Sequence, residues 1–516
     1  MSSPEDIDAL FEEIYIALLE RDPESATYYG VADLYGIGDT RLNSFDEAYQ
    51  TETYELIRGY VATLEAADRS QLTAAQQISL DVMLWDLRDR LAGERFRHHD
   101  YLVNQLWGVH NNLIDFMVNT HPLNSVADAE DYITRLQQTD EQFAQAAAQM
   151  RLRVAEGITP PRWMVDTVLN QMRGHFSGPP TQHTLYVTFV ARLAAVEGIP
   201  TAEQERLAAE LEQVIAEVVQ PAYENLHTTM TELRSAASDD DGVWHLPDGE
   251  AYYAYMLSHH TTTDLTAAEI HELGLQEVAR IQGEMIALFE ANGFGSNFLQ
   301  GVGQMYGQSD FIQISSAASR EEALAAYETA IAKAEERLGH LFGLKPQSPL
   351  DIVPVPDYFG GGPGAYYTSP PLDGSRPGTF WVNLSNGRRV FMLDVPTLAI
   401  HEGIPGHHFQ RAVQRELQGV PTFRRTNGVN AFAEGWALYV EKLAAEYGMY
   451  DDDPFGDFGR LQAELFRAVR LVVDTGIHDQ GWSRQEAVDY MTTNLGWPRG
   501  SVAGEVDRYI AWPGQA

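Results

Sequence analysis

The sequence predicts a mainly α-helical protein with one small β-sheet, and three observations carry this prediction. Residues 5–235 place apolar side chains at helical spacing, as at Ile7 and Leu10, with interruptions at glycine and proline. Residues 352–389 are instead rich in glycine, proline and aromatic side chains. Helical patterning resumes at Pro396 and continues to the end of the sequence. The sheet is therefore expected to be an insert in a helical body.

The helical N-terminal half is expected to span residues 1–235. Within it, the stretch Glu203–Leu233 predicts a helix that is kinked or broken at Pro221, because proline lacks the backbone N–H that a helix interior uses. The polar run SAASDDDG that follows predicts a loop and a subdomain boundary. Residues 242–516 would form the second half, and we expect the two halves to make one integrated domain.

Two elements of the second half have clear local signals. Thr266 followed by Glu269 is typical of a capping box that begins a helix, and Gly293 is placed to end it. The run Thr379–Leu384 alternates in the manner of a strand, which predicts the small sheet within residues 352–389.

Length and charge restrict the partners of the protein. A chain of 516 residues can bury a large core. Its formal net charge of −39 at pH 7, with no compensating basic stripe, disfavours nucleic acid and anionic membrane surfaces as partners. No apolar stretch approaches the roughly 20 residues of a membrane-spanning helix, so no membrane insertion is expected. The acidic start lacks the features of an export leader, which predicts a cytoplasmic protein, or a periplasmic or exported one whose leader was removed.

The sequence contains no cysteine. Disulfides, catalysis by a thiolate and thiolate metal ligands are therefore excluded. Any metal ion must bind histidine, aspartate or glutamate, and such a donor set suits Zn²⁺.

The segment LAIHEGIPGHHFQ carries the first sign of a metal centre. It places His401 directly before Glu402 on a predicted helix, as in proteins where a histidine binds zinc and the adjacent glutamate is the general base. A second ligand four residues after the first would share its helix face, but position 405 is proline. The second ligand must therefore come from beyond a change in the helix.

Pro405 and Gly406 predict such a change, because proline interrupts helical hydrogen bonding and glycine permits unusual dihedral angles. A looped-out turn would bring His407 or His408 to the metal. We favour His407, with His408 as the alternative ligand or as a partner of a ligand. If the Pro-Gly pair only ends the helix, both histidines are ordinary polar residues.

The third ligand is expected to be Glu434, which lies among apolar residues in NAFAEGWALYVEKL. A carboxylate in such surroundings needs a partner, and a metal ion is a suitable one. Glu441 lies on the same helix face, but its more polar surroundings favour a solvated position or a contact to a ligand. These residues together predict one zinc ion per chain.

A polar stripe at helical spacing contains Arg467, Arg470, Asp474 and His478 among apolar residues. One interpretation is an active-site wall, in which arginine, Arg470 included, binds a substrate carboxylate or orients a glutamate and His478 stabilises an oxyanion. The alternative for Arg467 and Asp474 is a buried salt-bridge network. Tyr509 is a further candidate for polarising the carbonyl of a scissile bond.

Tyr367 and Arg376 flank the predicted sheet and are candidates for substrate binding. An edge strand beside a zinc site can align an extended substrate, and the GGGPG loop before Tyr366 could close over it. The alternative is a hairpin with surface tyrosines. The pairs His98-His99 and His259-His260 have no accompanying carboxylate motif, so structural roles are expected for them.

Several long motifs, in order along the chain, resemble one family. They are GVWHLPDGEAYYAYMLSHHTTTDLTAAEIHELGL, DGSRPGTFWVNL, HEGIPGHHFQ, AEGWALYVEKL and RLVVDTGIHDQGW. The chain resembles the bacterial domain-of-unknown-function 885 family over almost its entire length. Its members are placed with zinc peptidases of the gluzincin group, which implies one large, helical, zincin-like catalytic domain with a deep cleft.

Position by position, the resemblance implies His401 and His407 or His408 as zinc ligands, Glu434 as the third ligand and Glu402 as general base. Similar sequences continue beyond the position of the final AWPGQA through a Ser-Tyr-Lys motif, so we expect part of the family's C-terminal segment to be missing here. Many relatives also begin with an export or lipoprotein leader.

The expected function is zinc-dependent hydrolysis of peptide bonds, with short peptides as substrates. One alternative is a non-haem iron oxygenase, because two histidines and one carboxylate also form its facial triad. A metal-free peptide-binding protein is the other alternative. The sequence does not specify the oligomeric state.

Overall fold

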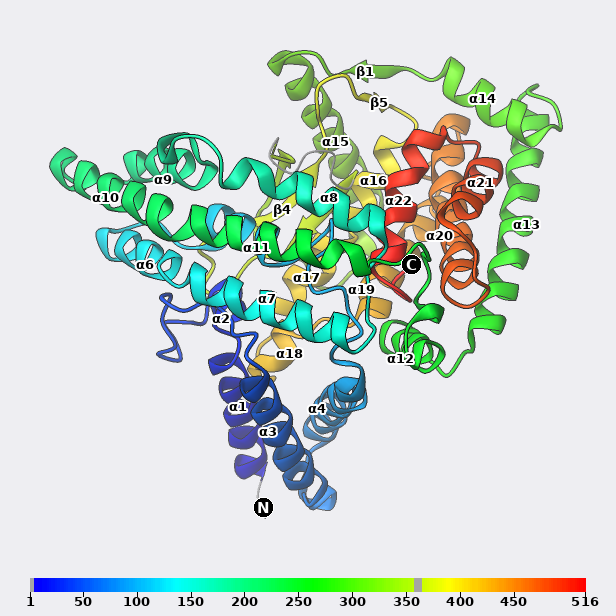
Figure 1. The fold of residues 1–516 in the computed structure, drawn as a ribbon. Helices are drawn as coiled ribbons and strands as arrows, with labels where there is room; N and C mark the ends of the chain where they lie inside the picture. Colours follow the sequence, from blue (N-terminus) through cyan, green and yellow to red (C-terminus); the bar gives the residue numbers. More distant parts are fainter. Residues whose placement is uncertain (1–3, 357–363) are drawn as a thin grey trace. The chain divides into compact units, whose positions relative to one another are not determined.

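The computed structural model describes residues 4–356 and 364–516, and most of them are helical (Figure 1). The predicted mainly helical architecture is thereby confirmed. The chain divides into two compact units, Met1–Tyr252 with Val420–Phe423 and Tyr253–Gly419 with Arg424–Ala516. Within the described ranges, no helix is both long and apolar enough to cross a membrane.

The first unit consists of helices. They are α1 (Pro4–Glu20), α2 (Pro23–Tyr28), α3 (Glu47–Glu65), α4 (Ala74–Gly93), α5 (Val109–Asp115), α6 (Val126–Leu136), α7 (Thr139–Ala155), α8 (Arg162–Met172), α9 (Thr184–Ala195), α10 (Thr201–Val214) and α11 (Gln220–Leu233). Their connections range from short turns to the segment 29–46 between α2 and α3. Helices α12 (Gly249–Thr261) and α18 (Thr422–Thr426) each contain a point where the chain passes from one unit to the other.

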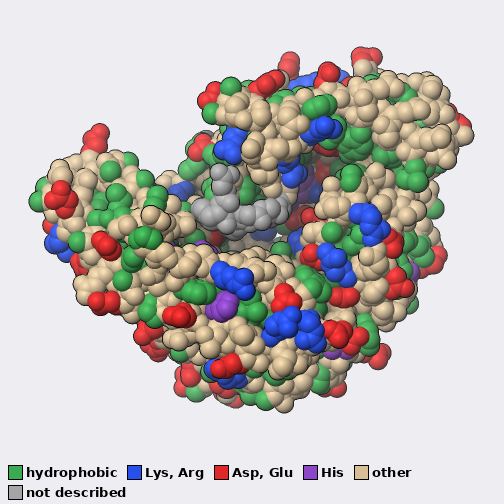
Figure 2. All heavy atoms as spheres, turned by 45° about the horizontal axis from the view of Figure 1, so that its top comes forward, with side chains coloured by type: hydrophobic (Ala, Val, Ile, Leu, Met, Phe, Trp, Pro, Cys, Tyr) green, Lys and Arg blue, Asp and Glu red, His purple; other side chains and the backbone are tan. Residues whose placement is uncertain are grey.

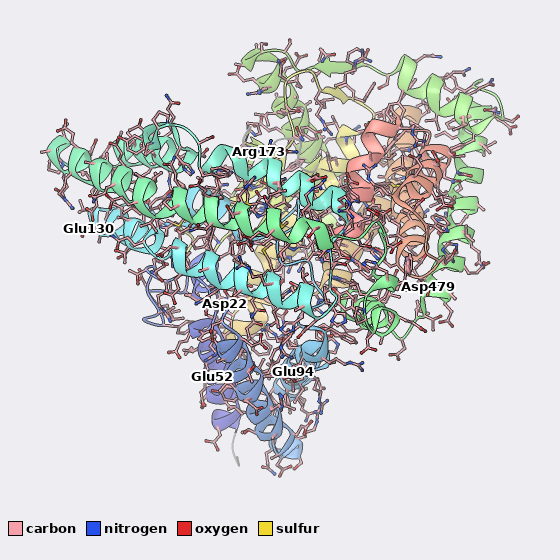
Figure 3. All side chains as sticks on the ribbon, viewed as in Figure 1. Asp22, Glu52, Glu94, Glu130, Arg173 and Asp479 are labelled. Carbon is pink, nitrogen blue, oxygen red and sulfur yellow. The ribbon has the colours of Figure 1, made fainter. Side chains whose placement is uncertain are left out.

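The core of the first unit lies among its later helices, where α7 and α8 pack against α11 (Figure 1). No break occurs at Pro221, because residues 201–233 are helical throughout; a π-helical segment, Ile215–Val219, joins α10 to α11, and Pro221 lies in the first turn of α11. At the surface, Glu130 of α6 accepts a hydrogen bond of 2.7 Å from Arg206 of α10 (Figure 3). Charged pairs of this kind lie outside an apolar interior.

The second unit contains helices and two small sheets. Its elements are α13 (Ala267–Ala291), α14 (Phe298–Gln308), β1 (Phe311–Gln313), α15 (Ala317–Leu338), β2 (Leu350–Pro354), β3 (Ala365–Thr368), β4 (Gly378–Val382), β5 (Arg389–Phe391), α16 (Val395–Glu402), α17 (His407–Glu416), α19 (Asn430–Glu446), α20 (Pro454–His478), α21 (Arg484–Leu495) and α22 (Arg499–Ala511).

Helices α13 and α20 pack along each other in the second unit. The predicted capping box begins α13, because the Thr266 hydroxyl accepts from the backbone of Glu269 while the Glu269 carboxylate accepts from the backbone of Thr266. At Gly274 a Cβ atom would lie 2.7 Å from Val472 and 2.9 Å from Leu471. Glycine therefore permits the close approach of the two helices.

The predicted sheet is present as three strands in the order β2-β4-β3, with β2 parallel and β3 antiparallel to β4. The predicted strand Thr379–Leu384 is found as β4, which begins one residue earlier and ends at Val382. A second sheet pairs β1 with β5, and the sequence did not predict it. The GGGPG loop before Tyr366 lies, apart from Gly364, outside the described residues.

Helix α16 occupies the centre of the second unit, where it contacts α15, α19, α20 and β3. Its apolar residues Val395 and Ala399 join a core cluster with Phe380 of β4 and Tyr327 of α15. The end of α16 is thus held between the sheet and the C-terminal helices. Figure 2 shows acidic side chains scattered over one face of the surface, in keeping with the net charge of −39.

Candidate metal centre

The predicted break after the His-Glu pair is present in the structure. Helix α16 ends at Glu402 and α17 begins at His407. A Cβ atom at Gly406 would overlap the carbonyl oxygens of Ile400 and His401, so only glycine allows the chain to turn back against the end of α16. This turn brings the rings of His401 and His407 together, with their centroids 4.7 Å apart.

Glu434 of α19 completes a group of three possible metal ligands with these histidines. Its carboxylate oxygens lie 3.6 Å from Nε2 of His401 and 3.6 Å from Nε2 of His407. Ligand atoms around a tetrahedral zinc ion, each about 2.0–2.1 Å from the metal, are about 3.4 Å apart. The three side chains therefore fit a single divalent ion.

The carboxylates around the histidines set the protonation of the centre. Burial and the guanidinium of Arg467 lower the pKa of His401, but Glu434, Glu441 and Glu402 outweigh both and raise this pKa to about 9. Burial raises the pKa of Glu434, yet His401 and His407 hold it well below the usual range of a carboxyl group. The centre thus attracts positive charge.

Glu441 holds His401 from the side opposite to the ligand position. Its Oε1 lies 2.6 Å from Nδ1 of His401, and the residue is 2% exposed. A carboxylate on Nδ1 fixes the ring orientation and leaves Nε2 to bind a metal ion. Of the two positions that the sequence left open for Glu441, the structure shows the contact to a candidate ligand, His401.

Glu402 lies at the C-terminal end of α16 and is 6% exposed. Its Oε2 is buried and makes no hydrogen bond to any described residue. A buried carboxylate oxygen without a donor costs free energy unless a ligand or water reaches it. Glu402 therefore retains an oxygen that is available for chemistry beside His401.

His408 points away from the three ligands and toward the sheet. Its Nδ1 lies 3.0 Å from the hydroxyl of Tyr367, and burial lowers the pKa of His408 to about 4. The ring of Tyr367 lies 6.5 Å from that of His407, stacked against it. His407, and not His408, thus belongs to the group of possible metal ligands, and the substrate-binding candidate Tyr367 lies beside it.

Three further residues were predicted for the site: His478, Tyr509 and Arg376. His478 is fully buried, with Nε2 3.0 Å from the carbonyl oxygen of Tyr509. The hydroxyl of Tyr509 donates to Glu505 at 3.1 Å. Neither residue belongs to the group of ligand atoms, so their roles in oxyanion stabilisation stay predictions. Arg376 is half-buried in the bend that precedes β4.

Among the described residues, Arg467 and Asp474 of the α20 stripe do not form the salt-bridge network considered as an alternative. Asp474 accepts hydrogen bonds from the hydroxyl of Tyr253 at 2.6 Å and from the backbone of Gly514 at 3.0 Å. Nη2 of Arg467 instead lies 3.4 Å from both ring nitrogens of His401. The N-terminal part of the stripe therefore faces the candidate metal centre.

One contact that the sequence analysis missed supports the turn between the ligands. The indole Nε1 of Trp436 donates to the carbonyl oxygen of Pro405 at 2.8 Å, and its ring stacks on Phe409. Trp436 follows Glu434 by two residues on α19. The only sequence signal was a tryptophan close to a predicted ligand, and Trp N–H groups usually find an acceptor when buried.

Two solved structures are similar to this chain. One, titled "The crystal structure of the putative lipoprotein from Colwellia psychrerythraea", has 31% sequence identity and a TM-score of 0.95, over 100% of this chain and 90% of that chain. The other, a "putative lipoprotein of unknown function" from Shewanella oneidensis, has 17% identity and a TM-score of 0.73 over the same shares. At the lower identity the likeness concerns the fold alone.

No curated protein matches the sequence. One family matches it over residues 23–516 and is described as "Bacterial protein of unknown function (DUF885)". This match covers nearly all of the described elements, the candidate metal centre included. The chain therefore belongs to the DUF885 family of bacterial proteins.

Proposed function

We propose that this protein is a zinc-dependent peptidase that hydrolyses short peptides. The observation that carries the proposal is the meeting of His401, His407 and Glu434 directly beside Glu402, whose buried Oε2 has no hydrogen-bond donor among the described residues. Two imidazoles and one carboxylate are the protein ligands of many catalytic zinc sites, which keep a further position for water or substrate. The arrangement supports a zincin-like site of the gluzincin type.

The chemistry would follow from the placement of Glu402. Zinc held by the three ligands would polarise the carbonyl of the scissile bond and make a nearby water more acidic. Glu402 takes a proton from this water as the water oxygen bonds to the carbonyl carbon. It returns the proton to the amide nitrogen when the carbon–nitrogen bond breaks. Glu441 keeps His401 oriented throughout.

The strand β3 supports a peptide as the substrate. It pairs with β4 along one edge, and its other edge pairs with no strand of the described residues. An extended peptide can add to such an edge through main-chain hydrogen bonds. Because Tyr367 of β3 lies beside His407, a peptide bound there would pass close to the metal ligands. A deep cleft of the gluzincin kind would restrict access to short, unfolded chains.

A non-haem iron oxygenase is the second candidate, because its facial triad consists of the same residue types. The geometry of the three ligands is compatible with both metals. Glu402 favours hydrolysis, since an oxygenase needs no general base directly after its first ligand. A metal-free peptide-binding protein would need neither Glu402 nor the clustering of the three ligands.

Elemental analysis of the purified protein tests the proposal. We expect about one zinc ion per chain in the wild type and little zinc in His401→Ala and Glu434→Ala. Glu446→Ala is the matched control, because Glu446 is an exposed glutamate at the end of the same helix as Glu434. Iron together with oxygen-dependent turnover would favour the oxygenase, and no metal in the wild type would favour the binding protein.

The variant Glu402→Gln separates metal binding from catalysis. We expect it to retain zinc but to cleave a library of short peptides about a thousandfold more slowly than the wild type. Zinc content and cleavage are measured on the same preparations. Full cleavage by zinc-loaded Glu402→Gln would overturn the assignment of the general base.

We also propose that the natural protein is exported. The support is the relative from Colwellia psychrerythraea, which is titled a "putative lipoprotein" and shares 31% identity with this chain. Fractionation of cells that make the natural protein tests this proposal, and recovery of the protein from the cytoplasm alone would contradict it.

A further inference from the structure

Arg467 and Arg470 lie one helical turn apart on α20 and share a face of that helix. Within the described residues, no carboxylate lies within 4.0 Å of either guanidinium. Arg460 of the same helix is different, because Asp457 and Glu464 lie 2.8 Å and 3.0 Å from its guanidinium. The two arginines near the candidate metal centre are thus the ones without an ion-pair partner on α20.

Arg470 is buried, so the lack of an ion-pair partner among the described residues costs free energy. Arg470 is 9% exposed, and its Nε makes no hydrogen bond to a described residue. Its Nη2 donates to the side-chain oxygen of Gln515 at 3.2 Å, which neutralises no charge. Burial, Arg508 and Arg467 lower the pKa of Arg470, and together they outweigh the opposing effects of Tyr509 and Glu505. Buried charges are rarely left unpaired in a folded protein.

Arg508 adds a third guanidinium to this arginine group, which we define as Arg467, Arg470 and Arg508. It donates to the same Gln515 oxygen at 2.7 Å and to Glu505 at 2.8 Å. Glu505 also accepts from the hydroxyl of Tyr509. Among the described residues, Glu505 is therefore the one carboxylate in an ion pair with the arginine group, and it pairs with Arg508 and not with Arg467 or Arg470.

The arginine group adjoins the candidate metal centre. Nη2 of Arg467 lies 3.4 Å from Nε2 of His401, the atom placed to bind a metal ion. Burial lowers the pKa of Arg508, but Glu505, Tyr509 and also the ligand Glu434 outweigh this and raise it. A group held by these arginines would therefore lie next to a substrate bond that is attacked at the metal.

We propose that the arginine group binds a carboxylate of the substrate, so that the protein cleaves peptides carrying a free carboxylate close to the scissile bond. This inference rests on the proposed peptidase function and names its substrate class. Guanidinium groups bind carboxylates through paired, charge-assisted hydrogen bonds, which give both affinity and orientation. The carboxylate is either the C-terminal one of the peptide or that of an Asp or Glu side chain.

Three thiol probes test the proposal with zinc-loaded protein, because a thiol binds zinc whether or not any peptide is cleaved. They are mercaptoacetyl-alanine with a free carboxylate, its carboxamide, and mercaptoacetyl-glutamate with an amidated α-carboxyl group. Affinities are measured by titration calorimetry. We expect a probe with a carboxylate to bind about tenfold to a hundredfold more tightly than the carboxamide.

The first and third probes separate the two sources of the carboxylate. Tighter binding of the alanine acid identifies the C-terminal carboxylate, and tighter binding of the glutamate amide identifies a side-chain carboxylate; either result supports the proposal. Equal affinity of all three probes, or binding of none, overturns it. The probe affinities are measured separately from metal content and peptide cleavage, which test the peptidase proposal, so failure of one proposal can be told from failure of the other.

Variants of the arginine group connect the preference to these residues. In Arg470→Gln we expect the preference for the acid over the amide to fall toward equality, with zinc content measured for each preparation. Arg467→Gln provides a second, less buried position should Arg470→Gln fold poorly. The control is Arg173→Gln, an exposed arginine of the first unit, which should keep the wild-type preference (Figure 3). A wild-type preference in both Arg467→Gln and Arg470→Gln would contradict the assignment.

Discussion

Both units contain buried histidines, but the chemical groups around these histidines differ between the two units. His110 and His121 of the first unit are fully buried. His110 lies 3.3 Å from the side-chain oxygen of Gln171, and His121 lies near the backbone carbonyls of Pro122 and Asp39. Burial lowers the pKa of His110 to about 4 and that of His121 to about 3. These histidines are neutral parts of the core.

His401 of the second unit is nearly as buried, at 4% exposure, but carboxylates surround it. Glu441 and Glu434 lie 2.6 Å and 3.6 Å from its ring nitrogens. Burial lowers the pKa of His401, as in the first unit, yet these carboxylates raise it overall to about 9. The charge of the neighbours, and not the degree of burial, therefore distinguishes a candidate metal ligand from a core histidine.

His98 of the first unit shows that carboxylates alone are not sufficient. Its ring nitrogens lie 2.7 Å from Glu156 and 3.1 Å from Glu47. The adjacent His99 is directed elsewhere and contacts the carbonyl oxygen of Pro247. Among the described residues, the one group of three converging ligand atoms is His401, His407 and Glu434. His98 thus differs from His401 because no second imidazole converges with its carboxylates.

The largest expected effect concerns that second imidazole. His407→Ala removes one of three ligands, and because structural zinc sites bind with about 10–16 kcal/mol in total, we expect zinc affinity to fall about a thousandfold or more. His408→Ala is the matched control, since its ring faces Tyr367. Competition with a chelating dye measures both. An equal loss of zinc affinity in His407→Ala and His408→Ala would mean that the two histidines act together. The neighbours of a histidine would then not identify it as a metal ligand.

The core histidines should instead make stability depend on pH. His110 titrates near 6.5 when unfolded and near 4 when folded, so the unfolded state binds more protons between these values. Stability is therefore complete above pH 6.5 and falls as the pH decreases toward 4, by up to about 3 kcal/mol for this residue. Urea unfolding at pH 7.5 and 4.5 should show a smaller loss in His110→Gln than in the wild type. An equal loss would show that His110 does not remain neutral in the core.

The sequence predicted those parts of the candidate metal centre that depend on the properties of single residues. Pro405 and Gly406 cannot continue a helix, and this alone indicated that His407 or His408 could reach the same metal as His401. Glu434 was indicated by a charge among apolar residues. The sequence favoured His407 but left His408 open, because the choice depends on how the turn folds against the end of α16 and on Tyr367.

Periodicity was less informative where it extended over a long helix. Arg467 and His478 share a helix face, but eleven residues of α-helix span about 16 Å, so the two ends of the stripe meet different neighbours. Arg467 contacts His401, whereas His478 contacts the backbone of Tyr509. The strand β1 was missed because it has three residues and its partner β5 is distant in sequence. Such pairing is decided by tertiary contacts.

A smaller effect is expected from the carboxylate that orients His401. Glu441→Gln keeps the shape of the side chain but removes its charge, and loss of such a partner typically weakens metal binding about tenfold to a hundredfold. Zinc competition measures the change, with Glu446→Gln as the control from the same helix. Unchanged affinity in Glu441→Gln would mean that the position of this carboxylate near His401 does not matter for metal binding.

The smallest effect is expected from Trp436, which supports the turn between the ligands without touching them. Trp436→Phe keeps an aromatic ring against Phe409 but removes the donor to the Pro405 carbonyl, a hydrogen bond of 2.8 Å. A lost hydrogen bond of this kind costs about 1 kcal/mol. If the turn loosens only in the metal-free protein, zinc binding must order it again, and zinc affinity should fall about fivefold. Tyr439→Phe is the control, because Tyr439 is 54% exposed on the same helix and packs against Trp436. If Trp436→Phe lost stability while keeping its zinc affinity, the hydrogen bond would support the fold and not the position of His407.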